Sequence, residues 1–88
     1  MKIEVKKFGE ILISRPAGRE AFLVAKAYLS PKTDKEAIEL DFDGVKVMGP
    51  SWADEFVTGL KSLYGQRVVC LPTKNPTIVL SLKTIEEQ

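Results

Sequence analysis

Charged and apolar residues alternate at the start of the chain and predict two short strands. Residues Lys2 to Lys7 alternate in the way that is typical of a half-exposed strand. Phe8-Gly9-Glu10 then supplies a turn, and Ile11 to Ile13 predict a second strand. We expect these strands to form an antiparallel hairpin, or one longer strand with a bulge at Gly9.

Helical spacing begins at Ser14 or Arg15, and Pro16 suits the first turn of that helix. Gly18 costs such a helix up to about 1 kcal/mol relative to Ala, so its start is expected to be irregular. The apolar residues that recur at helical spacing are Ala17, Ala21, Val24, Ala25 and Tyr28.

The middle of the chain predicts a loop followed by a strand. Ser30-Pro31 should end the first helix, and residues 32–35 should form an exposed loop. Ala37 to Phe42 predict the third strand, because their apolar residues share one face.

The clearest pattern in the sequence is a helix from about Trp52 to Tyr64, which Gly65 should end as a C-terminal cap. Its apolar stripe comprises Ala53, Phe56, Val57, Leu60, Leu63 and Tyr64. The continuous apolar run from Val68 to Leu71 then suits a strand that is covered on both faces.

The last segment is ambiguous, because residues 77–82 are rich in strand formers although Ile78, Leu82 and Ile85 keep helical spacing. Asn75-Pro76 resembles a helix cap followed by a first-turn proline. We predict a helix, since a helix completes the alternation of strands and helices. These elements together predict a single α/β domain over residues 1–88, with a four-stranded mixed sheet and about three helices mainly on one face.

Composition narrows the function. With 13 basic and 12 acidic residues and no basic stripe, the chain does not look like a nucleic-acid binder. It has no apolar run long enough to cross a membrane and no signal sequence, so we expect a cytoplasmic protein. The absence of histidine excludes zinc hydrolase and Ser-His-Asp chemistry within the chain. Cys70 is the single cysteine, and we expect a buried structural thiol.

The segment Leu40 to Phe56 carries the candidate chemistry, because a strand, a turn and a helix start follow one another there. Ser51 fits a capping box with Asp54, and it could alternatively be a phosphorylation switch at the start of the helix. Trp52 should fold back onto the core or, if it is exposed, anchor a protein partner.

The acidic residues of this segment allow a second hypothesis. Asp41, Asp43 and Asp54 could gather into a pocket that accepts a phosphoryl group or binds a metal ion. A nucleotide sensor at the same helix start is a further alternative, although no Gly-rich phosphate loop supports it. The structural alternative is that Asp41 fixes the turn by a hydrogen bond and that Asp54 caps the helix.

The sequence LDFDGVKVMGPSWADEF resembles the central motif of STAS domains, which occur in sulfate transporter tails and in anti-sigma factor antagonists. It is more similar still to a STAS-like family of bacterial and archaeal proteins. The matching residues are Leu40, Asp41, Phe42, Gly44, Val45, Gly49, Ser51, Ala53, Asp54, Glu55 and the later Asn75-Pro76. In anti-sigma factor antagonists a kinase phosphorylates the first serine of the turn, and Pro50 stands at that place here.

This resemblance implies a STAS-like fold and a non-enzymatic regulatory module without a cofactor. It further implies that a protein partner, such as an ATPase or kinase of the anti-sigma type, docks at the turn. The residues implied are Gly49, Pro50, Ser51, Trp52, Asp54 and Glu55, with Ser51 as the candidate phosphorylation site. The oligomeric state stays open.

Overall fold

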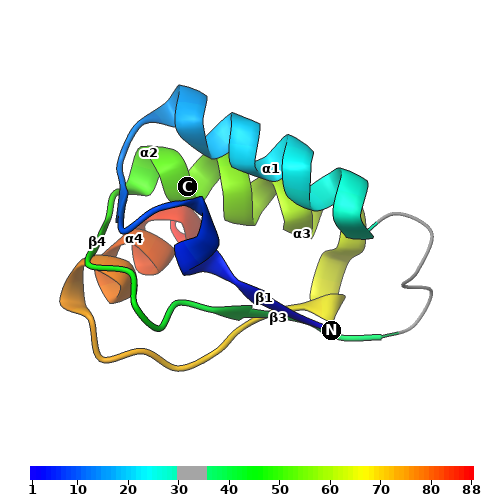
Figure 1. Ribbon diagram of the computed structural model, residues 1–88. Coiled ribbons are helices and arrows are strands. Elements are labelled where there is room, and N and C mark those ends of the chain that lie inside the picture. Colours follow the sequence, from blue (N-terminus) through cyan, green and yellow to red (C-terminus); the bar gives the residue numbers. More distant parts are fainter. Residues whose placement is uncertain (30–35) are drawn as a thin grey trace.

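The computed structural model of the protein describes residues 1–29 and 36–88. The predicted helix end at Ser30-Pro31 and the predicted loop at residues 32–35 lie outside these residues. Within the described part of the chain, strands and helices alternate in an α/β arrangement (Figure 1).

Two small parallel sheets form instead of the predicted four-stranded mixed sheet. The first has the order β1-β3-β5 and comprises β1 (Lys2–Glu4), β3 (Ile38–Asp41) and β5 (Val68–Cys70). The second pairs β2 (Ile11–Leu12) with β4 (Val47–Met48), a strand that the sequence did not predict. The three strand pairings among residues 1–29 and 36–88 are all parallel.

The predicted hairpin between the first two strands is therefore wrong. Val5–Phe8 forms a 3-10 helix, η1, which shortens the first predicted strand to three residues. Gly9 follows with φ 134° and ψ 168°, and the chain continues beside β4 without folding back on β1. The alternative of one longer strand with a bulge at Gly9 is wrong as well, because η1 separates β1 from β2 and the two strands belong to different sheets.

The helices agree better with the prediction. They are α1 (Arg15–Leu29), the consecutive segments α2 (Pro50–Ala53), η2 (a π-helix, Asp54–Thr58) and α3 (Gly59–Tyr64), and α4 (Pro76–Glu86). Gly65 ends α3 with φ 60°, and a short 3-10 helix, η3 (Gly65–Arg67), leads to β5. The predicted cap at Gly65 and the helical last segment are thus confirmed. In the described residues, no helix combines the length and the apolar character that a membrane span needs.

The helices lie on one side of the three-stranded sheet. Figure 1 shows α1 above the helix formed by α2, η2 and α3, with β1 and β3 beneath them. Ile38 and Leu40 of β3 are completely buried, whereas Val69 of β5 is 42% exposed on the other face. The prediction that this last strand is covered on both faces is therefore wrong.

The buried face of α1 differs from the predicted apolar stripe. The helix buries Gly18, Ala21, Ala25 and Leu29, while Val24 and Tyr28 are 57% and 68% exposed. Gly18 explains the difference, because it allows α1 to approach the backbone of Trp52 closely. The buried face of α1 therefore includes Gly18, and the pattern of hydrophobic residues could not predict this because glycine has no side chain.

Candidate functional site

The turn before the second helix begins the candidate site. Gly49 is the N-cap residue, with φ −104° and ψ 159°, and Pro50 occupies the first helical turn. The Ala53 N–H donates to the Gly49 carbonyl oxygen at 3.1 Å. The helix thus begins before Ser51, and no side-chain cap bond forms at its N-cap. The predicted capping box of Ser51 is wrong, and its half-exposed hydroxyl lies inside the first turn.

Trp52 lies in the core. Its side chain is 1% exposed and stacks on Phe56, with 4.7 Å between the ring centroids and 26° between the planes. The expectation that Trp52 folds back is confirmed, and its alternative role as an exposed anchor is wrong. Among the residues implied for partner docking, Trp52 can therefore act only by supporting the turn from below.

Asp54 and Glu55 hold the start of α1. One nitrogen of the Arg15 guanidinium, Nη1, lies 2.9 Å from Asp54 Oδ2 and 2.7 Å from Glu55 Oε2. Both bonds raise the pKa of Arg15 above its ordinary value, and the bond to Glu55 has the larger effect. Asp54 is therefore an ion-pair partner of α1, and the predicted helix-cap role for it is wrong.

Asp41 fixes the turn that follows β3, as predicted. Its Oδ1 accepts a hydrogen bond from the Asp43 backbone N–H at 3.0 Å, and Oδ2 lies 3.3 Å from Lys2 Nζ. The bond from Asp43, with a smaller effect of Lys2, lowers the pKa of Asp41 below its ordinary value. Gly44 completes the turn with φ +90°, a conformation that favours glycine.

The acidic residues do not converge on a common pocket. Asp41 is engaged by Asp43 and Lys2, whereas Asp54 is engaged by Arg15. Within residues 1–29 and 36–88, no group of three or more His, Cys, Asp or Glu side chains is placed to hold a metal ion. The geometry thus does not form the metal-binding phospho-acceptor pocket that was considered for Asp41, Asp43 and Asp54.

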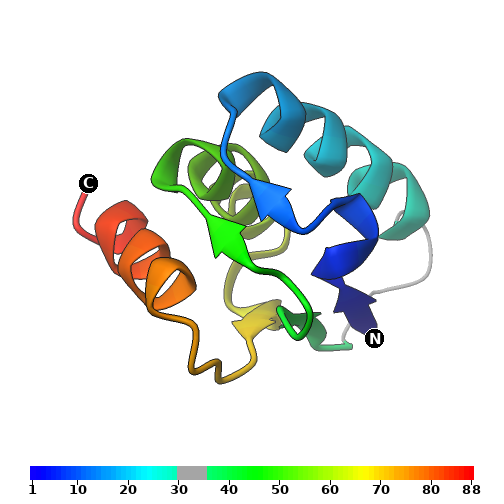
Figure 2. The same ribbon diagram turned by 60° about the vertical axis from the view of Figure 1, so that its left-hand side comes forward.

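An uncovered apolar face of the β2–β4 sheet adjoins the turn at Gly49 and Pro50 that begins the second helix. Ile11 pairs with Val47, and Ile13 lies two residues further along the same face. Ile11, Ile13 and Val47 are 64%, 56% and 37% exposed, whereas Leu12 and Met48 on the opposite face are 2% exposed. Figure 2 shows β2 and β4 side by side in front of the start of α2.

This apolar face continues into the turn. A Cβ atom placed on Gly49 would lie 3.6–3.7 Å from backbone and side-chain carbons of Ile13, and Pro50 is exposed. We call this continuous area the docking surface; it comprises Ile11, Ile13, Val47, Gly49, Pro50 and Ser51. Sequence reasoning missed its first three residues. The available signal was that residues 11–13 are all apolar, which one buried face does not require.

Helix α4 holds β4 in place below this surface. The Met48 N–H donates to Thr77 Oγ1 at 3.2 Å, and the buried Ser81 hydroxyl donates to the Met48 carbonyl oxygen at 2.7 Å. Asn75 Nδ2 also donates to the carbonyl oxygens of Val45 and Lys46, at 3.0 and 2.8 Å. Asn75, which together with Pro76 matches the STAS-like motif, therefore holds the docking surface in place without being part of it.

Cys70 belongs to β5 of the three-stranded sheet and is not one of the residues of this surface. Its thiol is free and half-buried, and burial raises its pKa above the ordinary value. A raised pKa keeps the thiol protonated at neutral pH, which fits a structural role.

Comparison with known protein families identifies a match that includes the turn at Gly49 and Pro50. Residues 24–71 match the family described as STAS-like domain of unknown function (DUF4325). Searches of curated proteins and of solved structures found no match. The family match covers more than half of the 88 residues and includes β3, the turn and the second helix. The chain therefore belongs to the family of STAS-like domains of unknown function.

Proposed function

We propose that this domain is a non-enzymatic regulatory module that binds a protein partner through the docking surface. The observation that carries the proposal is the uncovered apolar face formed by Ile11, Ile13 and Val47 beside the turn. Apolar side chains that gather on a surface are typical of protein interaction sites. The three side chains gather on one face of the β2–β4 sheet, while Leu12 and Met48 already bury its other face.

The partner class follows from the resemblance to anti-sigma factor antagonists. We infer that the partner is an ATPase or kinase of the anti-sigma type in the cytoplasm. We do not expect a nucleic acid or a membrane to be the partner. Such a partner would meet Pro50 and Ser51 together with the isoleucines of β2. Asp54 and Glu55 lie within half-buried ion pairs to Arg15, so we assign them to the support of the turn.

Ser51 supplies the regulatory part of the proposal. Phosphorylation would add about two negative charges in the first turn of the helix, where the helix dipole tolerates them. The fold would persist, because Ser51 makes no cap bond that a phosphate would break. The partner would instead meet a charged group next to the apolar face, and its binding would weaken.

The experiment compares substitutions of exposed or half-exposed residues outside the core. Ile13→Lys and Ser51→Asp should each reduce the amount of partner that is captured from the source cell. With the purified partner, each variant should then bind about tenfold more weakly than the wild type, or worse. Ser51→Ala should bind like the wild type. Val69→Lys is the matched control, since Val69 is an exposed apolar residue on the other sheet.

Circular dichroism spectra should be identical for all of these variants. Capture of the same partner by the wild type and by Ile13→Lys would refute the docking surface. Unchanged binding by Ser51→Asp alone would remove the switch and leave the surface standing.

A further inference from the structure

The first strand leaves one edge without a partner strand in the described part of the chain. On its other edge, the Glu39 N–H donates to the Met1 carbonyl oxygen at 2.7 Å. Met1 and Ile3 therefore direct their backbone groups toward β3. Because backbone groups alternate along a strand, the N–H groups of Lys2 and Glu4 and the carbonyl of Lys2 face the open edge. An open edge of this kind can pair with another strand.

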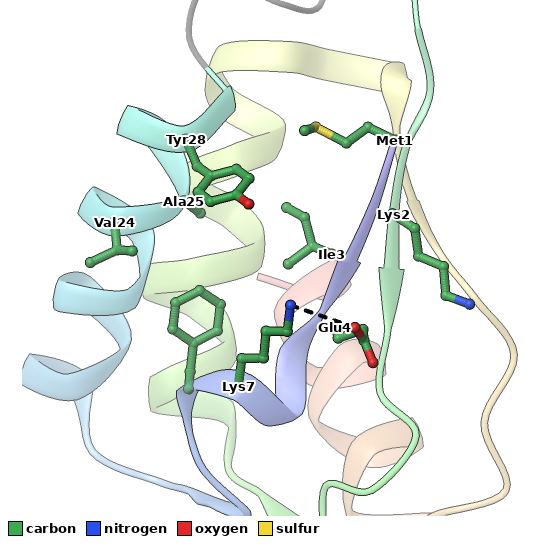
Figure 3. A pocket seen from close by; sticks show the side chains of 9 residues that line it. Met1, Lys2, Ile3, Glu4, Lys7, Val24, Ala25 and Tyr28 are labelled. Carbon is green, nitrogen blue, oxygen red and sulfur yellow. Dashed lines mark ion pairs between the residues drawn. The ribbon is translucent and has the colours of Figure 1, made fainter.

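An apolar groove lies beside this edge. A cavity of about 360 Å³ opens between β1, η1 and α1, and Figure 3 shows its lining side chains. Its apolar lining comprises Met1, Ile3, Phe8, Val24, Ala25 and Tyr28. In Figure 3, Ile3 points into the groove whereas Lys2 points away on the other face of the strand. A strand added at this edge would thus cover apolar surface that a lone chain leaves exposed.

The charges on β1 make the edge complementary to itself. In an antiparallel pairing centred on Ile3, Lys2 of each copy lies opposite Glu4 of the other, and opposite charges across strands are stabilising. A parallel pairing in register would instead oppose lysine to lysine and glutamate to glutamate. The antiparallel pairing also lets each Glu4 N–H donate to the Lys2 carbonyl of the other copy.

The same pairing fills the groove. Residues directly opposite each other point to the same face of a sheet, so the two Ile3 side chains meet on the groove side. They would lie there beside Val24 and Tyr28, which are more than half exposed in the single chain. Lys2 points away on the opposite face of the strand, whereas Lys7 of η1 lies at the groove and forms an ion pair with Glu4 at 3.6 Å (Figure 3).

We propose that two copies of this chain associate through β1 in this antiparallel register. The two sheets join into one with the order β5-β3-β1-β1-β3-β5, related by a two-fold axis at Ile3. The association does not depend on the proposed docking function, because the docking surface contains no residue of β1 or of the groove.

Charge reversal tests the register directly. Sedimentation equilibrium of the wild type should show a monomer–dimer equilibrium at concentrations up to about 1 mM. Lys2→Glu and Glu4→Lys each turn both interchain contacts into like-charge contacts, and each should raise the dimer Kd about tenfold or more. Mixed in equal amounts, the two variants oppose two glutamates to two lysines, and dimerisation should return.

Two further variants separate the interface from general effects of charge. Val24→Glu changes an exposed groove residue and should weaken dimerisation without unfolding the chain, which thermal melting checks. Lys46→Glu disrupts a different exposed ion pair, that of Lys46 with Glu10 at 3.0 Å, and should dimerise like the wild type. A wild type that stays monomeric throughout, including one that instead binds extended peptides of other proteins at this edge, overturns the proposal. The proposal is also overturned if neither Lys2→Glu nor Glu4→Lys changes the dimer Kd. It is overturned as well if the equal mixture of these two variants stays monomeric.

Discussion

At the scale of single residues, Gly18 decides how the two long helical segments meet. A Cβ atom at this position would lie 2.7 Å from the carbonyl oxygen and 3.0 Å from the Cα of Trp52. These are backbone atoms of a residue whose own side chain is fixed in the core. Neither helix can move aside without disturbing Trp52 and its stacking on Phe56, so the position requires glycine.

Gly18→Ala should therefore destabilise the protein, although alanine favours helices. The gain in helix propensity is about 1 kcal/mol at most, whereas forced overpacking typically costs about 1–3 kcal/mol. We expect a net loss in the free energy of unfolding, measured by urea denaturation. Ala17→Gly, at the exposed neighbouring position, provides the comparison and should lose only the propensity difference of about 1 kcal/mol. A more stable Gly18→Ala protein would contradict the close approach.

At the scale of elements, α4 shows how one residue can begin a helix and fix a neighbouring strand. Asn75 Oδ1 accepts from the Thr77 N–H at 2.9 Å and caps α4, while its Nδ2 donates to Val45 and Lys46. Thr77 in turn accepts from Met48 of β4. The cap and the support of β4 are therefore two separable functions of one side chain.

Two substitutions of Asn75 separate them. Asn75→Ala removes the cap, worth about 1 kcal/mol, and also the two bonds to the carbonyls near β4. Asn75→Asp keeps the cap but places an oxygen against those carbonyls, and should still lose about 1 kcal/mol or more. Chemical denaturation should rank wild type above both variants. If Asn75→Asp is as stable as the wild type, the amide bonds to Val45 and Lys46 contribute nothing.

The same scale shows what the sequence could predict. The signals for the second helix and for α4 are local, namely apolar spacing, Gly65 and Asn75-Pro76, and these elements were predicted correctly. Strand partners depend on residues far apart in the chain, so the parallel pairing of β1 with β3 could not be deduced from the turn at Gly9. The two residues of β4 are too few to show any period. The burial of Trp52 and its contact with Gly18 are likewise long-range.

At the scale of the whole molecule, the two proposed surfaces lie apart. Figure 1 shows β4 and the start of α2 at one end and the N-terminus of β1 at the other. The family motif identified the turn, because its residues are consecutive in the sequence. The docking surface around the turn and the groove beside β1 combine distant segments, and only the fold brings them together.

This separation predicts that dimerisation and docking act independently in solution but cooperate on a surface. A dimer would carry two docking surfaces, so on densely immobilised partner the wild type should dissociate more slowly than Lys2→Glu, because bivalent attachment raises apparent affinity. In dilute solution both should bind the partner with the same Kd, measured by titration calorimetry. Ile13→Lys should do the opposite, losing the partner while dimerising like the wild type. A changed solution Kd for Lys2→Glu would mean that the partner also contacts β1, and the two surfaces would then be one.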